Sequence, residues 1–415
     1  MTGAATAAPT EDPTDLPSPE AFTAECRAFL EARYPRRTKQ ETPFRWGEGS
    51  DEVGLFEEAD PEVEAAQVAV VRQWRRQLWE AGLAWLTGPV EHGGRGLPNR
   101  YQQLFDREAR DFDVPGNGKL TISLGMIAPT ILAHGTPGAK DRYLQALQRG
   151  DLIACQLFSE PGAGSDLAAV STSAVRDGDG WRLNGQKVWT SGAQYSDVGE
   201  VLCRSSDEGR HRNLTAFVVD MHAPGVEVRP LRQMTGGAAF NEVFFADAWV
   251  PDDDRLGEVG EGWRVAITTL SNERAAIGGD GFGGSGLLSF ERYRQMAHAL
   301  GRADDPVIRQ QLADLLINQR VANYTRQRAV AARRAGQSPG PEASIGKLAL
   351  ARQFQRIGDL ASALLGPKLV ADTGEWGTYA WAGLVLSAPG YRIGGGTDEV
   401  MKNIVAERVL GLPKA

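Results

Sequence analysis

Cysteine and histidine are both scarce in this sequence. Among 415 residues there are three cysteines and five histidines, and the cysteines, Cys26, Cys155 and Cys203, lie far apart. An odd number of widely spaced cysteines supports neither a disulfide framework nor a zinc-binding pair. The histidines form no HExxH pair. The sequence therefore predicts no metal site, and because it fits a reducing compartment we expect a cytoplasmic protein.

Long apolar runs are also missing. No stretch approaches the roughly 18–20 consecutive apolar residues that a membrane-spanning helix needs. The N-terminus, MTGAATAAPTEDPTDLPSPE, lacks the basic start and the apolar core of a signal peptide. Its Ala, Thr, Pro and Asp content is typical of disorder. We therefore expect a disordered tail over residues 1–19 and no membrane partner.

Positive charge is in deficit. The chain has 45 Lys and Arg against 53 Asp and Glu, a formal net charge of −8. Such a chain lacks the basic footprint of a nucleic-acid-binding protein. Its length exceeds what one hydrophobic core normally serves, so two or three domains are expected.

The hydrophobic period changes twice along the chain. Over residues 20–151, apolar side chains recur at helical spacing. Residues 152–255 contain strand-sized apolar or alternating segments, and Asp177-Gly178-Asp179-Gly180 between two of them is typical of a hairpin turn. Over residues 256–415, long helical patterns with short links favour a bundle. The expected fold is α+β and multidomain: an N-terminal helical domain, a middle antiparallel β-domain and a C-terminal helical bundle.

Three glycine- or tryptophan-containing motifs follow one another in the chain. QLFSEPGAGSD covers residues 156–166, and NGQKVWTSG covers residues 184–192. GGGTDEVMKN (394–403) and AERVLGLP (406–413) close the chain. A glycine-rich turn leaves backbone N–H groups free for a ligand, and a glycine-rich loop before a helix is a potential phosphate site. On pattern alone, each motif is equally compatible with an ordinary turn.

Taken together, these motifs resemble the signature segments of the acyl-CoA dehydrogenase family. The likeness extends from about residue 20 to the end of the chain. It implies an N-terminal helical domain, a middle antiparallel β-barrel and a C-terminal four-helix bundle. It also implies an FAD enzyme that removes two hydrogens across the α,β bond of an acyl thioester, assembled as a homotetramer or dimer.

The resemblance assigns ligand contacts to the first two motifs. It implies that Phe158 and Ser159 line the flavin ring, that Trp189 packs against the ring and that Ser191 lies at flavin N5. A hydroxyl there would polarise the atom that accepts hydride. Ser165 would contact the CoA part of the substrate.

The sequence departs from the family pattern at two positions. Gln156 stands where many members carry an aromatic residue, and Gly395 stands where medium-chain-type members carry the catalytic glutamate. Isovaleryl-CoA and long-chain acyl-CoA dehydrogenases instead carry their glutamate on a bundle helix, directly before an arginine. Glu273-Arg274 matches that second arrangement. Glu273 is therefore the candidate base, although on spacing alone a solvated helix face is the favoured interpretation of the pair.

The implied chemistry explains why a carboxylate is needed. The α-proton of a thioester is weakly acidic, and hydrogen bonds to the carbonyl oxygen stabilise the enolate. The resemblance implies that one of these hydrogen bonds comes from the FAD ribityl 2′-OH and the other from the N–H of Gly395. Glu273 would then accept the α-proton. Arg274 would stiffen the helix, balance charge and lie near the substrate.

The terminal motif and the bundle complete the implied cofactor site. Thr397 and Glu399 would face the FAD pyrophosphate and adenosine, and Arg302 would reach FAD of a neighbouring subunit. GDGFGG at residues 279–284 matches GxGxxG, but it follows a helix and has no βαβ unit around it, so we expect no dinucleotide site there. An aromatic cluster is expected to serve packing: Trp376, Tyr379 and Trp381.

Three functions stay open at this stage. The first is a dehydrogenase of acyl-CoA or of a carrier-bound acyl thioester that passes electrons to an electron-transferring flavoprotein. Because fold does not determine function and Gly395 replaces a usual marker, a flavin oxidase or monooxygenase is the alternative. The third is a catalytically silent subunit of a hetero-oligomer, which would not bind FAD when expressed alone.

Overall fold

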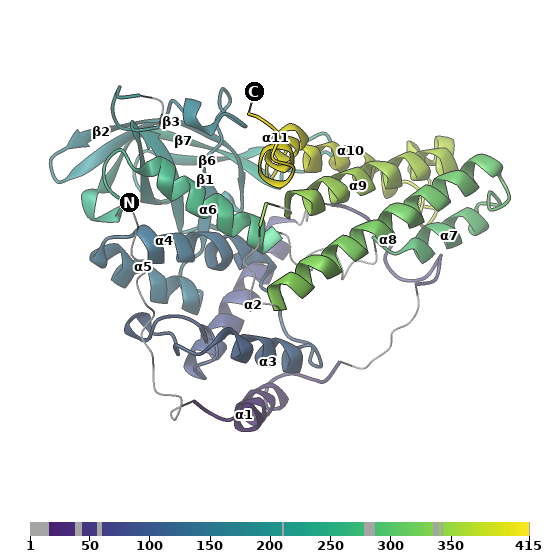
Figure 1. Ribbon diagram of the computed structural model, residues 1–415, viewed down its shortest axis with the longest axis horizontal. Helices are drawn as coiled ribbons and strands as arrows, with labels where there is room; N and C mark the ends of the chain where they lie inside the picture. Colours follow the sequence, from purple (N-terminus) through teal and green to yellow (C-terminus); the bar gives the residue numbers. More distant parts are fainter. Residues whose placement is uncertain are drawn as a thin grey trace.

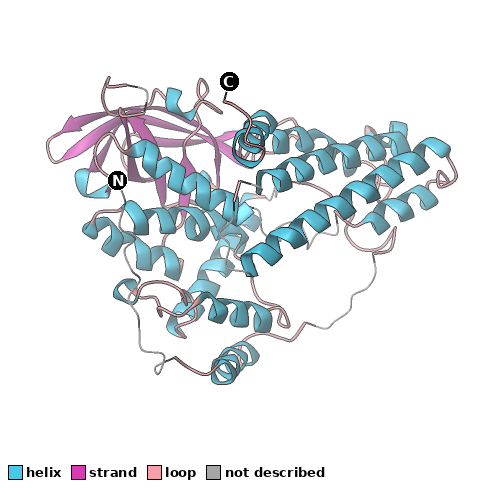
Figure 2. Cartoon of the chain, viewed as in Figure 1, coloured by secondary structure: helices cyan, strands magenta, loops and turns pink. Residues whose placement is uncertain are grey.

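The computed structural model describes residues 16–37, 44–55, 60–209, 211–277, 287–334, 340–341 and 343–414. In these ranges the chain begins with helices, continues with strands and ends with helices, in the order that the hydrophobic period predicts (Figures 1 and 2). The helices before the first strand are α1 (Pro19–Glu31), α2 (Pro61–Glu80), α3 (Asn99–Ala109), α4 (Ala128–His134) and α5 (Pro137–Arg149).

Three of these helices begin in the same way. Ser18, Asp60 and Thr136 each precede a proline at the first helical position, and each side chain accepts a hydrogen bond from a backbone N–H of the first turn. A proline sacrifices no hydrogen bond at this position, because the first N–H groups of a helix have no partner within the helix. These starts are therefore determined locally.

The strands form one sheet in the order β6-β7-β3-β2-β4-β5-β8, with β1 paired to β4. The hairpin expected at residues 177–180 is confirmed, with Asp177 opposite Gly180. The expected middle β-domain is confirmed and most of its strand pairs are antiparallel, but β1 runs parallel to β4 and β2 pairs with β4 in parallel at Ser173. The chain passes through the β2–β3 hairpin between β1 and β4 and so enters both in the same direction. The strands are β1 (Ala154–Leu157), β2 (Ser173–Asp177), β3 (Gly180–Ser191), β4 (Val198–Arg204), β5 (Leu214–Asp220), β6 (Val226–Leu231), β7 (Phe240–Pro251) and β8 (Arg255–Leu256).

The helices after the sheet divide between two cores. Helices α7 to α10 share one apolar core, in which Trp381 of α10 is fully buried. Helix α6 instead buries Val265 and Ala266 against α4, α5 and the sheet, and it lies beside α4 in Figure 1. The bundle core is thus formed by α7, α8, α9 and α10, whereas α6 belongs to the core beside the sheet. The bounds are α6 (Gly262–Ile277), α7 (Phe290–Ala299), α8 (Pro306–Arg334), α9 (Ala343–Leu365), α10 (Trp381–Ser387) and α11 (Asp398–Ile404), followed by a π-helical turn (Val405–Val409).

The aromatic cluster near the C-terminus packs as expected in part. Trp376 meets Trp46 edge to face at 5.0 Å between ring centroids, which attaches residues 44–55 to the bundle. Trp381 lies in the core, whereas Tyr379 is exposed. No helix in the described part of the chain is both long and apolar enough to cross a membrane. The GDGFGG segment lies outside the described residues.

Candidate active site

The first motif forms a tight turn at the end of β1. Glu160 and Ala163 exchange two backbone hydrogen bonds of 2.9 and 3.1 Å. The backbone N–H of Val188 donates to the Ser159 carbonyl at 2.8 Å, which brings Phe158 and Ser159 beside the second motif on β3. Phe158 is buried and Ser159 half-buried, whereas Ser165 is exposed on the far side of the turn. Two predicted flavin contacts and the predicted CoA contact therefore lie on one loop.

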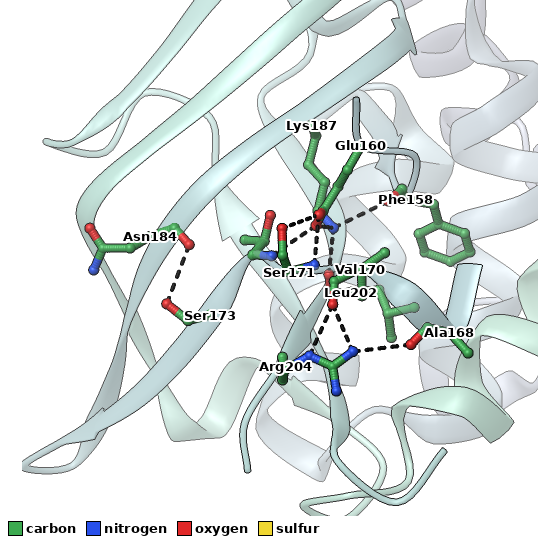
Figure 3. Close-up of polar contacts among 11 residues, drawn as sticks. Phe158, Glu160, Ala168, Val170, Ser171, Ser173, Asn184, Lys187, Leu202 and Arg204 are labelled. Atoms are coloured by element: carbon green, nitrogen blue, oxygen red, sulfur yellow. Dashed lines mark hydrogen bonds and ion pairs between the residues drawn. The ribbon is translucent and has the colours of Figure 1, made fainter. Parts of the chain in front are cut away.

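A buried ion pair supports this turn from behind (Figure 3). Lys187 is fully buried, and its Nζ donates to Glu160 Oε1 at 2.7 Å, to the Leu202 carbonyl at 2.7 Å and to the Phe158 carbonyl at 3.2 Å. Glu160 also accepts from the Ser171 backbone N–H at 2.6 Å and its hydroxyl at 2.7 Å. The pair thus ties the segment that follows β1, including Phe158, to β3 and β4.

The charge state of Glu160 follows from these contacts. Burial by itself raises the pKa of this carboxyl. The charge of Lys187 and the hydrogen bonds from Lys187, Thr172 and Ser171 lower the pKa by more than burial raises it. The net pKa is about 2. Glu160 is therefore ionised at neutral pH.

Trp189 has an unusual backbone conformation. Its φ is 63°, in the left-handed region, at an irregularity in the β3–β7 pairing between Lys187 and Thr190. This conformation costs an L-residue roughly 1–2 kcal/mol, and such strain concentrates at functional sites. Trp189 is 56% exposed. Among the described aromatic rings, its indole packs only against Phe240, in a T-shaped arrangement with 5.9 Å between ring centroids. Beside it, the buried Thr190 hydroxyl has no hydrogen-bond partner in the described chain. Strand β3 therefore presents an exposed indole two residues before Ser191, whereas the Thr190 hydroxyl is buried.

Helix α6 brings the candidate base to the terminal motif. Glu273 lies in its last turns and is half-buried, and a Cβ added to Gly395 would lie 3.6 Å from Glu273 Oε1. Gly395 itself has φ 66°. The two positions at which the family carries its glutamate are thus adjacent, and the missing side chain at Gly395 leaves room for the Glu273 carboxylate. The side chain of Arg274 lies outside what the structure describes.

The glycine-rich loop around Gly395 is held at both ends. Asp398, which is 2% exposed, accepts a hydrogen bond from Arg392 Nε at 2.9 Å and lies 3.8 Å from Lys347 Nζ. Lys347, on α9, also donates to the Gly396 carbonyl at 2.5 Å. The Thr397 hydroxyl caps α11 by accepting from the Val400 N–H at 3.1 Å. Three charged side chains therefore position the backbone whose N–H is expected to meet the thioester carbonyl.

The remaining predicted cofactor residues have simpler surroundings. Glu399 is exposed and lies 3.5 Å from Lys402. Arg302 pairs with Asp305 at 2.6 Å, and it donates to the Ala363 carbonyl at 3.3 Å. Within one chain Arg302 is thus held in the bundle, and its reach toward a neighbouring subunit stays a prediction.

Four side chains that support the site were not predicted from the sequence: Glu160, Lys187, Lys347 and Asp398. A weak signal exists for Lys187, because it is a lysine at a position where the strand alternates toward the core. Asp398 and Lys347 carry no such signal, since their contacts join α9 to α11. Among the described residues no cluster of His, Cys, Asp and Glu is arranged to hold a metal ion.

Comparisons with known proteins agree with this architecture. The three domain families of the acyl-CoA dehydrogenases match in order: the N-terminal domain at residues 53–151, the middle domain at 155–248 and the C-terminal domain at 260–410. The chain is 39% identical to acyl-CoA dehydrogenase IpdE1 of Mycobacterium tuberculosis over 83% of this chain and 88% of that protein. It is 38% identical to acyl-CoA dehydrogenase FadE34 of the same organism, over 85% of this chain but 48% of that longer protein.

A solved structure resembles the whole chain. The ChsE4–ChsE5 complex of Mycobacterium tuberculosis is similar with a TM-score of 0.67 and 26% identity, over 98% of this chain and 100% of that chain. The domain order, the motifs and the relatives lead to one assignment. This chain belongs to the acyl-CoA dehydrogenases, the FAD-dependent oxidoreductases that introduce a double bond into acyl-CoA thioesters.

Proposed function

We propose that this enzyme uses Glu273 as the base that removes the α-proton of an acyl thioester. The observation that carries the proposal is the approach of the Glu273 carboxylate to the space beside Gly395. A base must lie within hydrogen-bonding reach of its proton, and the N–H of Gly395 is the expected donor to the thioester carbonyl. With carboxylate and donor this close, one thioester can contact both.

We propose that the surface formed by Phe158, Ser159, Trp189 and Ser191 holds FAD, with Thr397 and Glu399 toward its phosphates and adenosine. The exposed indole fits a bound aromatic group there. FAD, when bound, supplies the acceptor for the two electrons and the β-hydrogen of the substrate. The chain's own residues orient the thioester, exclude water and hold the α-proton at Glu273.

The test of this function is reduction of the bound flavin. Purified yellow protein is mixed anaerobically with a panel of acyl-CoAs, and loss of flavin absorbance is followed. A dehydrogenase is bleached by at least one thioester and reoxidised rapidly by an electron-transferring flavoprotein but slowly by oxygen. Rapid reoxidation by oxygen would instead favour the oxidase or monooxygenase, and a colourless protein that gains no FAD would favour the silent subunit.

We propose that the enzyme works as a homo-oligomer, a dimer or tetramer. Helix α8 exposes three large apolar side chains at helical spacing, Ile317, Val321 and Tyr324. An exposed apolar face of this kind is typical of an interface. Size-exclusion chromatography with light scattering tests this, because a monomeric mass at micromolar concentration would contradict it.

Replacing Lys347 with methionine is expected to weaken FAD binding about tenfold. The variant loses a charge-assisted hydrogen bond to the Gly396 carbonyl, of a kind that contributes roughly 1.5–3 kcal/mol, and partial exposure reduces the effect. The measurement is the dissociation constant of FAD from fluorescence titration of the apoprotein. Lys402→Met removes an exposed lysine of the same motif and should change the constant less than about twofold. Equal effects of the two variants would remove Lys347 from the site.

A further inference from the structure

A buried carboxyl group lies where the three parts of the chain meet. Glu200, on β4, is 0% exposed. Its Oε1 lies 2.7 Å from the Thr269 hydroxyl of α6, and that hydroxyl lies 3.0 Å from the Thr130 hydroxyl of α4. Thr130 donates to the Met126 carbonyl at 2.8 Å. A series of three short contacts therefore joins the sheet, the base helix and the N-terminal helices.

Counting hydrogens in this series indicates the state of Glu200. The Met126 carbonyl can only accept, so the single hydrogen of Thr130 points toward it. The contact between the two threonines then requires the hydrogen of Thr269, which lies farther from its other acceptor, the Val265 carbonyl, at 3.3 Å. The contact between Thr269 and Glu200 is left without a hydrogen unless the carboxyl group of Glu200 carries one. All three contacts are hydrogen bonds only when Glu200 is a neutral acid.

The surroundings of Glu200 agree with this count. Its second oxygen, Oε2, has no hydrogen-bond partner in the described chain, and an ionised carboxylate would leave that oxygen uncompensated. Burial raises the pKa of the Glu200 carboxyl to about 8. Glu200 therefore stays protonated at neutral pH.

The two strands that flank Glu200 place uncharged residues beside it. Its register partners are Gln156 on β1 and Val218 on β5, and both are uncharged. From α6 it meets the Thr269 hydroxyl, which in turn contacts the Thr130 hydroxyl of α4. Four described ionisable groups of these elements have other partners: Cys155 lies beside Met221, Asp220 accepts from the His222 N–H, His134 lies beside Thr268 and Arg264 pairs with Glu261. Glu273 lies one turn beyond Thr269 on α6.

We propose that Glu200 is a positioning residue for the base, and this rests on the proposed role of Glu273. As a neutral acid it fastens Thr269, and Glu273 follows Thr269 by four residues, on the same side of the helix. Asn272, the neighbour of the base, also donates to the Thr130 hydroxyl at 3.4 Å. The series of contacts thus determines how close the end of α6 that carries Glu273 lies to Gly395. Ionisation of Glu200 breaks one link and loosens the helix.

The decisive variant is Glu200→Gln, because its amide donates as the acid does but cannot ionise. At pH 7 its rate of flavin reduction by acyl-CoA should lie within about twofold of the wild-type rate. Above pH 8 the wild-type rate should fall, whereas the variant rate should not, relative to its own value at pH 7. Thr269→Val, of similar size but without a donor, should lower kcat roughly 10–100-fold at pH 7 with little change in KM, the scale of a misplaced base. Equal alkaline profiles of wild type and Glu200→Gln would overturn the proposal.

A second measurement does not depend on the reaction. The carboxyl pKa is raised on folding from 4.5 to about 8, so the folded chain keeps a proton that the unfolded chain releases in this window. The wild-type melting temperature should therefore fall relative to that of Glu200→Gln as pH rises from about 4.5 to about 8, and no further above it. A pH-independent difference would overturn the proposal. If no thioester reduces the wild-type flavin but this difference appears, the proposed function fails and the protonated Glu200 stands.

Discussion

Glu273→Gln is expected to slow flavin reduction by the best acyl-CoA at least ~10²-fold, while the purified variant keeps its FAD. The amide matches the carboxylate in shape but cannot accept the α-proton, and loss of a general base costs on the order of 10²–10⁴-fold. Stopped-flow absorbance under anaerobic conditions measures the rate in a single turnover. Because Glu273 is not among the residues expected to hold FAD, the flavin spectrum should be unchanged.

The matched control for this variant is Glu261→Gln. Glu261 immediately precedes α6 and pairs with Arg264 at the surface, so its loss should change the rate less than about twofold. Reduction of the Glu273→Gln protein at the wild-type rate would show that Glu273 is structural and that the base lies elsewhere.

Moving the glutamate is a further test of the same geometry. The double variant Glu273→Gly with Gly395→Glu puts the carboxylate at the other family position, which is adjacent in this structure. It should recover part of the rate that Glu273→Gly loses. Recovery stays incomplete because Gly395 has φ 66°, a conformation that costs a glutamate roughly 1–2 kcal/mol. No recovery at any pH would contradict the adjacency of the two positions.

Lys187→Met is expected to lower the free energy of unfolding by about 3–5 kcal/mol, the largest stability effect we expect from one substitution. The change leaves the Glu160 carboxylate buried without its counter-charge and removes the donor to the Phe158 and Leu202 carbonyls. Urea denaturation at pH 7, followed by circular dichroism, measures the shift. Because the lysine orients the end of β1, the variant should also retain less FAD on purification.

The control for Lys187→Met lies on the same strand. Arg182 pairs with Asp177 at 2.8 Å, but both side chains are about half exposed. Arg182→Met should cost only about 0–1 kcal/mol, as is usual for surface pairs. A Lys187→Met effect as small as that of Arg182→Met would show that the buried pair adds nothing to stability. The double variant Lys187→Met with Glu160→Gln should cost less than the two single changes added together, since they share one interaction.

The same ion pair predicts the behaviour of the protein in acid. The folded pKa of Glu160, about 2, lies below its usual value of 4.5. A carboxyl group whose pKa is depressed on folding contributes stability above its unfolded pKa and loses that contribution as pH falls through the folded value. Wild-type stability should therefore decline between about pH 4.5 and pH 2, and this decline should be smaller in the Lys187→Met variant.

Features encoded by neighbouring residues could be predicted from the sequence. The order of helices, strands and helices follows from the change in hydrophobic period. The Asp177–Gly180 hairpin depends on a turn in which Gly178 has φ 61°, so local composition suffices. The motif resemblance also led to the family that the three domain matches show. Two details could not be predicted from neighbouring residues: β1 pairs in parallel with a strand beyond the hairpin, and α6 packs on the sheet.

By itself, the sequence determined the family, the succession of elements and the choice of Glu273 as candidate base. Only the tertiary structure decided that Glu273 meets Gly395, that Lys187 and Glu160 are a buried pair and that Glu200 lies against Thr269. The physical reason is that each of these contacts joins residues from separate elements. In the sequence alone, a single glutamate or lysine is indistinguishable from a solvated surface side chain. Only packing in three dimensions removes the water around it. Burial then determines the charge state of each group, and proximity determines what that group can do.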